Sequence, residues 1–250
     1  MIPAHLQALA KAEDTHWWFV ARRRIIARVL QSLPQPGPWR IFDIGCGPGG
    51  NLEMLARFGE VAACETDAAV RGLAQQRGFR VAEGGRLPEE LPYAGETFDL
   101  VTLLDVLEHV GDDRAGLVAI RPRLAPNGWL VVTVPAFQWL WSAHDEGSHH
   151  LRRYTRTQLG EVLRAAGYRN VTAGYFNFWL FPLACLAKWF NRKSHDNRVP
   201  GLAVPPAPLN RLLTAIMASE AARVMHGGWP WGVSIVAWAQ PTLPTRPNPP

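Results

Sequence analysis

The sequence predicts an α/β fold, a doubly wound and mostly parallel sheet with helices on both faces. An apolar strand expected at 41–44 runs into a glycine-rich turn at 45–50, and a helix is expected to follow. Apolar strand segments then alternate with helical segments along the chain. The segment 129–134 is almost entirely apolar, as a strand buried on both faces of a sheet should be.

Composition favours one domain. A chain of 250 residues with 48% hydrophobic content can bury a substantial core. Three widely separated cysteines without CxxC spacing favour a reducing, cytoplasmic location, and the first residues show no signal-peptide pattern. The net charge of +5 is ascribed to overall arginine content. No nucleic-acid partner is expected, because neither a target-base motif nor a separate binding domain is found.

The glycine turn predicts a ligand site. Gly45, Gly47, Gly49 and Gly50 let the backbone bend sharply and approach a ligand, because no Cβ intervenes. The free N–H groups at the start of the next helix attract polar or anionic ligand groups. Dinucleotide-binding folds use a similar turn. The spacing DxGCGxG, in place of GxGxxG, argues against a nicotinamide cofactor and an oxidoreductase.

Four motifs stand in order along the chain: DIGCGPG at Asp43–Gly49, VAACETD around Glu65, FDLVTLLDVLEHV at Phe98–Val110 and RLAPNGWLVVTVP at Arg123–Pro135. Together they resemble the class I S-adenosylmethionine (SAM)-dependent methyltransferases over roughly residues 16–175. The resemblance implies a transferase with SAM as cofactor and a Rossmann-like, seven-stranded sheet. The region after the fifth strand looks like an uncharacterised bacterial branch, distantly similar to ubiquinone-biosynthesis-type O-methyltransferases.

We therefore expect one methyltransferase domain over 1–240. Its parts are a lid helix and linker (16–39), a SAM-binding core (40–175), a helical cap between strands six and seven (176–226), and a closing strand (229–239), with a disordered tail at 241–250. The lid helix is expected over 15–30, with Thr15 as its N-cap. One continuous helix is expected over 209–225.

The resemblance also implies which residues bind the cofactor. These are Asp43, Gly45, Cys46, Gly47, Gly49, Glu65, Leu104, Asp105, His109, Trp18 and Arg23. Glu65 ends the second strand about twenty residues after the turn, where a carboxylate binds ribose hydroxyls; a helix-capping role is the alternative. Asp105 is also a candidate helix cap. Arg22 or Arg23 would reach the SAM carboxylate, unless both are solvated.

The loop over 134–155 carries the candidate catalytic residues, because it begins at the carboxyl end of a parallel strand, where ligands bind. Methyl transfer needs an aligned nucleophile and often a base, and histidine suits proton removal near neutral pH. We expect His144 with Asp145 beside it, then His149 or His150. A divalent metal held by two histidines and a carboxylate is the less favoured alternative.

The expected substrate-binding residues are Trp139, Trp141, Arg152, Arg153, Tyr154 and Glu220. Arg152 and Arg153 suit a carboxylate or phosphate, or form a solvated rim. Glu220 lies on the apolar face of its helix, so it either faces the substrate cavity or pairs with Arg223.

The apolar, aromatic segment 176–190 is too short to span a bilayer and is interrupted by a proline. It fits a cap over an apolar substrate, a dimer interface, or a peripheral membrane contact through 176–193 with a basic flank. The expected function is methyl transfer to a small or lipid-like, apolar or aromatic acceptor, most readily at oxygen. Nitrogen and carbon methylation stay open, as do a monomer and a homodimer; a nucleic-acid methyltransferase is disfavoured.

Overall fold

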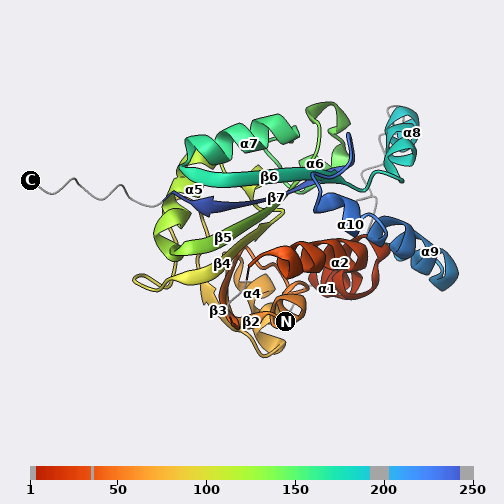
Figure 1. Ribbon diagram of the computed structural model, residues 1–250. Coiled ribbons are helices and arrows are strands. Elements are labelled where there is room, and N and C mark those ends of the chain that lie inside the picture. The colour runs from red at the N-terminus through yellow and green to blue at the C-terminus, as the bar shows by residue number, and fades with distance from the viewer. Residues whose placement is uncertain (1–3, 35–36, 192–202, 243–250) are drawn as a thin grey trace, which may run out of the picture.

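The computed structural model describes residues 4–34, 37–191 and 203–242, and Figure 1 shows a twisted sheet between two layers of helices. Seven strands follow the order β3-β2-β1-β4-β5-β7-β6. β7 runs antiparallel to both its neighbours, and the other pairs are parallel. The predicted doubly wound, mostly parallel α/β fold is confirmed. The strands are β1 (Trp39–Ile44), β2 (Gly59–Glu65), β3 (Arg80–Glu83), β4 (Phe98–Leu104), β5 (Leu124–Pro135), β6 (Tyr168–Phe176) and β7 (Ser234–Pro241).

Two layers of helices bury the two faces of the sheet (Figure 1). α5 and α7 cover one face, while α2, α3, α4 and α10 cover the other. β5 is buried on both faces along most of its length, as its apolar run predicts. The helices are α1 (Ala4–Thr15), α2 (Trp17–Ser32), α3 (Leu52–Leu55), α4 (Ala68–Gln76), α5 (Asp113–Ile120), α6 (Ala143–Gly147), α7 (Arg156–Ala165), α8 (Phe181–Asn191), α9 (Ala207–Ala218) and α10 (Ala221–Val224).

The N-terminal region differs from the prediction of one helix beginning at Thr15. Thr15 ends α1, and its hydroxyl donates to the carbonyl of Lys11. The cap of α2 is His16, whose backbone is extended and whose Nδ1 accepts the N–H of Trp18 at 3.3 Å. The break lets α1 turn back against α2.

The C-terminal part also differs in its boundaries. The helix expected over 209–225 is interrupted at Ser219 and Glu220, between α9 and α10. The closing strand begins at Ser234 and includes Pro241, and the N–H of Thr242 donates to the carbonyl of Gly167 at 2.9 Å. The expected disordered tail therefore cannot begin at 241, and residues 243–250 lie outside the described residues.

Two short connections at the carboxyl ends of strands form the site. The carboxyl ends of β1 and β4 lead into the glycine turn and into a 3-10 turn at Leu107–His109. α8 and α9 lie beyond this end of the sheet (Figure 1). Within the described ranges, none of the helices has the length and apolar character needed to cross a bilayer.

Candidate cofactor and acceptor site

The glycine turn after β1 takes a conformation that side chains oppose. Gly45 has a φ of +70°, and a Cβ there would lie 2.8 Å from Cγ2 of Val106. Gly47 and Gly49 also have positive φ, at +57° and +88°. The N–H groups of Gly45 and Cys46 both donate to the carbonyl of Cys64, which ties the turn to β2. Glycine is therefore required here by the backbone conformation and, at Gly45, by close packing against Val106.

Glu65 lies at the end of β2, next to this turn. Its Oε2 accepts the N–H of Gly47 at 3.0 Å, and its Oε1 accepts the N–H of Asp67 at 3.0 Å. The cap of α4 is Asp67, whose carboxylate accepts two N–H groups of the first turn. The alternative of Glu65 as the helix-capping acid is thus wrong, and its carboxylate lies at the edge of the turn.

Asp43 is the buried acid beneath the turn. Its Oδ1 accepts the hydroxyl of Thr102 at 2.5 Å, whereas its Oδ2 is buried without a partner. Burial raises the pKa of Asp43 to about 7. An unpartnered buried oxygen is costly, so this atom is available to a bound ligand.

Arg22 is the buried cation of the site. It forms an ion pair with Asp105 and lies 4.8 Å from the ring centre of Trp18. Arg23 instead donates to the carbonyls of Glu13 and Asp14, at 2.7 and 3.5 Å, on the α1 side. Of the two predicted arginines, the structure brings Arg22 to the carboxyl edge and directs Arg23 to α1.

Asp105 does not cap a helix, contrary to that prediction. It has a φ of +62°, and its Oδ1 accepts the hydroxyl of Thr133 at 3.0 Å. The following 3-10 turn has Val106 at its N-cap position. Leu104, one residue earlier, is buried at the end of β4. The arrangement holds a carboxylate between β4, β5 and α2.

The loop after β5 contains a network centred on Asp145, which is fully buried. Its Oδ1 lies 2.8 Å from Nδ1 of His150, and its two oxygens accept Nε and a terminal nitrogen of Arg153 at 2.7 and 2.8 Å. The N–H of Ser142 also donates to it at 2.8 Å. The predicted pairing of Asp145 with His144 is wrong, because the carboxylate points to His150 across the loop.

Three histidine rings gather beside this network. The ring of His150 lies 4.8 Å from that of His109 and 5.9 Å from that of His144, centre to centre. His149 is exposed and has a φ of +57°. The structure thus brings His109, which sequence reasoning assigned to the cofactor, together with two of the candidate bases.

Glu108 lies beneath these histidines and was not predicted. It is fully buried, neither of its carboxyl oxygens has a partner, and burial raises its pKa to about 8. One ligand atom from each of Glu108, His109 and His150 lies within 4.8 Å of the others, so these residues can hold a metal ion. The only sequence signal for Glu108 was its position in the motif DVLEHV, just before His109.

The predicted substrate-binding residues divide into two groups. Arg152 pairs with Asp113 at 3.1 Å, and the buried Tyr154 donates its hydroxyl to the same carboxylate at 2.8 Å. With Arg153 bound to Asp145, these side chains hold the loop in place. Trp139 is 55% exposed beside Phe181 of α8, and Trp141 is half-buried.

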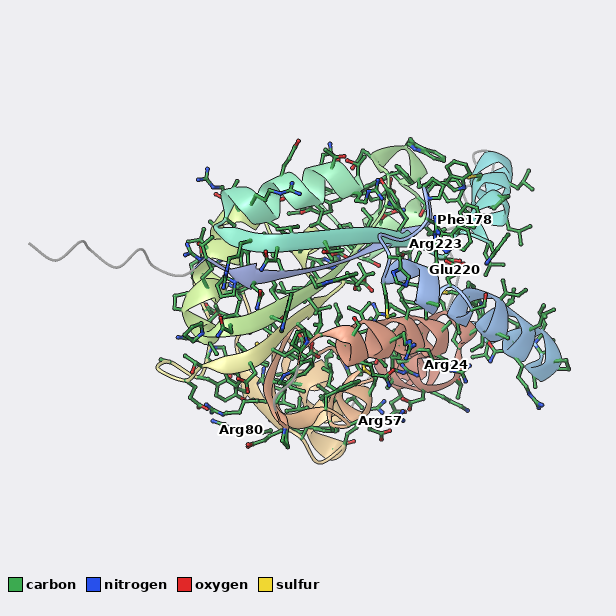
Figure 2. The ribbon with its side chains drawn as sticks, in the orientation of Figure 1. Arg24, Arg57, Arg80, Phe178, Glu220 and Arg223 are labelled. Atoms are coloured by element: carbon green, nitrogen blue, oxygen red, sulfur yellow. The ribbon has the colours of Figure 1, made fainter. Side chains whose placement is uncertain are left out.

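Glu220 neither faces a substrate cavity nor pairs with Arg223. It is fully buried, and it accepts the N–H groups of Phe178 and Trp179 at 2.9–3.1 Å. Figure 2 shows Glu220 and Phe178 together at the end of the sheet where α8 begins. The prediction that it binds substrate is wrong, because backbone donors of the β6–α8 connection occupy the carboxylate.

Comparisons with known proteins show the family and the fold. The profile of a family described as "Methyltransferase domain" matches residues 16–173. A ubiquinone biosynthesis O-methyltransferase of Cereibacter sphaeroides is 31% identical over 166 residues, which cover 58% of this chain and 67% of that protein. A second, from Dinoroseobacter shibae, is 31% identical over 170 residues, covering 60% and 68%.

A solved structure has the same fold. It is a SAM-dependent methyltransferase of Thermotoga maritima, described as a possible histamine N-methyltransferase, with a TM-score of 0.57 and 18% identity. The match covers 90% of this chain and 92% of that one. At this identity the likeness speaks for the fold.

Proposed function

This chain belongs to the methyltransferase domain family and is a SAM-dependent methyltransferase, and from that premise we propose that it methylates an oxygen of a small, apolar or aromatic acceptor. The observation that carries the proposal is the Asp145–His150 pair beside Glu108 and His109 at the carboxyl edge of the sheet. The relatives' names support oxygen as the acceptor atom, since they are O-methyltransferases of ubiquinone biosynthesis.

His150 is the proposed general base. When Nδ1–H donates to Asp145, Nε2 is left to accept a proton from the acceptor hydroxyl. SAM, when bound, would supply the methyl group: the acceptor oxygen would bond to the methyl carbon as the carbon–sulfur bond breaks, with S-adenosylhomocysteine as the product. Although burial alone would raise it, hydrogen bonds from His150 and Arg153 hold the pKa of Asp145 below its ordinary value, so it stays ionised.

The proposed cofactor contacts follow from the turn. Glu65 would take the ribose hydroxyls, and Arg22 the carboxylate of SAM, after exchange from Asp105. Gly45, Gly47 and their neighbours would line the path between them. α2 is the proposed lid, with the guanidinium of Arg22 over the ring of Trp18. The described parts of 176–226 form the proposed cap, and residues 192–202 of that range lie outside the described residues.

Two measurements test this function. Calorimetric titration should give micromolar SAM binding that weakens at least tenfold, about 1.4 kcal/mol, in Glu65→Ala. With catechol-like acceptors, His150→Ala should lower kcat by a factor of about 100 to 10,000, while SAM affinity is kept. Turnover of amine but not hydroxyl acceptors would overturn the assignment to oxygen.

A metal-assisted variant of this function is favoured by Glu108. Two buried, unpartnered oxygens beside two histidines fit a divalent cation, which would be held by Glu108, His109 and His150. Such an ion would make an acceptor hydroxyl more acidic. Loss of turnover in a chelator and its return with Mg²⁺ or Zn²⁺ would select this variant; turnover unaffected by the chelator would select His150 alone.

We also propose that α8 makes a peripheral membrane contact of a cytoplasmic enzyme, as an apolar acceptor would suit. Trp179, Leu183 and Leu186 are 53%, 59% and 52% exposed at this end of the sheet. Leu183→Glu should reduce sedimentation with phosphatidylglycerol vesicles, and Val118→Glu, at an exposed site on α5, should not. A homodimer that Leu183→Glu dissociates would assign the face to a second copy instead.

A further inference from the structure

We propose that Glu13 of α1 is a further cofactor-binding residue, which binds the α-ammonium group of SAM and makes α1 a wall of the cofactor site. Glu13 lies outside the residues that match the family, which begin at 16. The inference rests on SAM as cofactor and does not depend on which acceptor is methylated.

α1 is held against the glycine turn by three arginine contacts. Arg77 donates to the carbonyl of Pro48 at 2.8 Å and pairs with Asp14 at 3.0 Å, which joins the turn to α1. Arg23 donates to the carbonyl of Glu13 at 2.7 Å, which joins α1 to α2. The end of α1 is thus fixed above the turn.

The Glu13 carboxylate lies directly on the turn. Its Oε2 accepts the N–H of Gly50 at 3.0 Å, and a Cβ on Gly50 would overlap that oxygen. A Cβ on Gly47 would lie 3.8 Å from Oε1. Because the N–H of Gly47 donates to Glu65, the two carboxylates flank the same turn. Glu13 is therefore positioned along the path on which the cofactor must lie.

Acidic side chains outnumber the basic ones at this edge of the site. Carboxyl groups of Glu13, Asp43, Asp105 and Glu108 surround Arg22, the cation buried among them. SAM brings a sulfonium and an ammonium against one carboxylate, so its binding would offset the excess of negative charge. With Arg22 taking the carboxylate, Glu13 is the acid of α1 that lies on the turn, where it can take the ammonium group.

The raised pKa of the Glu13 carboxyl group agrees with a role in binding a cation. Burial raises its pKa to about 7, despite the lowering effects of Arg22, the Gly50 N–H, Arg77 and Arg23. The charged groups that face it are Arg22 and Arg23 from α2 and Arg77 from the end of α4, with Asp14 as the neighbouring acid. A bound ammonium would favour the ionised form.

Glu13→Gln tests the proposal, because the amide keeps an oxygen for the N–H of Gly50 and removes only the charge. Three ligands are titrated calorimetrically: SAM, S-adenosylhomocysteine, and 5′-methylthioadenosine, which lacks the amino-acid end. We expect Kd to rise about tenfold or more for the first two ligands and to change less than twofold for the third.

Asp14→Asn is the matched control. It removes the pair with Arg77 on the same turn of α1 but not the charge on the glycine turn. We expect the relative Kd values of the three ligands to be the same in Asp14→Asn as in the wild-type protein. A thermal melt of each variant with and without ligand checks that it is folded.

Two results would overturn the proposal. If Glu13→Gln lowers the affinity for all three ligands equally, Glu13 only holds α1 against the glycine turn. If it changes none of the affinities, Glu13 faces no group of the ligand. Failure of the cofactor assignment itself is distinguishable, since the wild-type protein would then bind neither SAM nor S-adenosylhomocysteine.

Discussion

Asp43 and Asp145 are buried aspartates in the two halves of the site, and their surroundings differ. Asp43, beneath the glycine turn, has one oxygen bonded to Thr102 and one without a partner. Asp145, in the loop after β5, accepts donors from His150, Arg153 and Ser142. Burial raises the pKa of the first to about 7, and donors lower that of the second.

The same contrast separates Glu108 from Glu220. Both are fully buried, but Glu108 has no partner for either oxygen, whereas Glu220 is bonded to two backbone N–H groups. A buried carboxylate without hydrogen-bond partners reduces stability and is a candidate for binding a ligand. A buried carboxylate whose oxygens are hydrogen-bonded stabilises the fold. Asp43 beneath the glycine turn and Glu108 beneath the histidines thus keep oxygens without partners, whereas Asp145 and Glu220 hold the acceptor loop and the start of α8 in place.

The largest test of this contrast is Asp145→Ala. It leaves Arg153 and His150 buried without their partner, so we expect the free energy of unfolding to fall by about 3–5 kcal/mol in urea titration. Asp14→Ala, which removes an exposed pair, should cost less than about 1 kcal/mol. Similar losses in the two variants would contradict the structural role of Asp145.

A smaller loss is expected from Glu220→Ala. The N–H groups of Phe178 and Trp179 would lose their acceptor, at a cost of about 1–3 kcal/mol. Glu220→Gln, which keeps one acceptor oxygen, should lose less. Denaturant unfolding measures both variants, and SAM affinity should stay within twofold. A large loss of SAM or acceptor affinity in a stable Glu220→Gln protein would restore the ligand-binding role.

Asp43→Asn should show the opposite pattern. The amide can still accept the Thr102 hydroxyl and needs no charge in the buried site, so stability should change by less than about 1 kcal/mol. SAM affinity should fall about tenfold, or about 1.4 kcal/mol, in calorimetry. Unfolding of the variant with unchanged SAM binding per folded molecule would place Asp43 among the structural acids.

The pH dependence of stability gives the smallest and most general test. Asp43 and Glu108 have folded-state pKa values of about 7 and 8, above their unfolded values, so their protonated forms favour the fold. As pH rises from about 4 to 8, this stabilisation is lost, and the melting temperature of the ligand-free protein should fall. Saturating SAM should reduce the fall.

Asp145 works in the opposite direction. Its pKa is lowered in the fold, so its contribution is present above the unfolded value and is lost as pH falls below about 4. Asp43→Asn should flatten the fall between pH 4 and 8 and leave the acid limb unchanged. A melting temperature that is constant between pH 5 and 8 in the wild-type protein would contradict the raised pKa values of Asp43 and Glu108.

The fold and the glycine turn were predictable because their signals are local. Alternating apolar segments and the spacing from Gly45 to Glu65 follow from backbone geometry. Side-chain partners are not local in this sense. Arg22 and Arg23 are adjacent, but successive helix positions differ by about 100° in direction, so one faces Asp105 and the other α1.

The acceptor loop shows where sequence reasoning stopped. Proximity along the chain suggested His144 as the partner of Asp145, but a short helix and a turn bring His150 back to it. Glu13 gave no signal, because its contact with Gly50 depends on how α1 folds back after His16. The candidate site residues whose roles depend on ligands stay predictions.

The position of β7 has a consequence for synthesis of the chain. β7 lies between β5 and β6, although it follows both of them along the chain. Until residues 234–241 have emerged from the ribosome, β5 and β6 each lack a neighbour and expose unpaired backbone groups. Between the emergence of β6 and that of β7, the nascent sheet therefore has an open gap beside β5, and chaperones would shield it from aggregation in this interval.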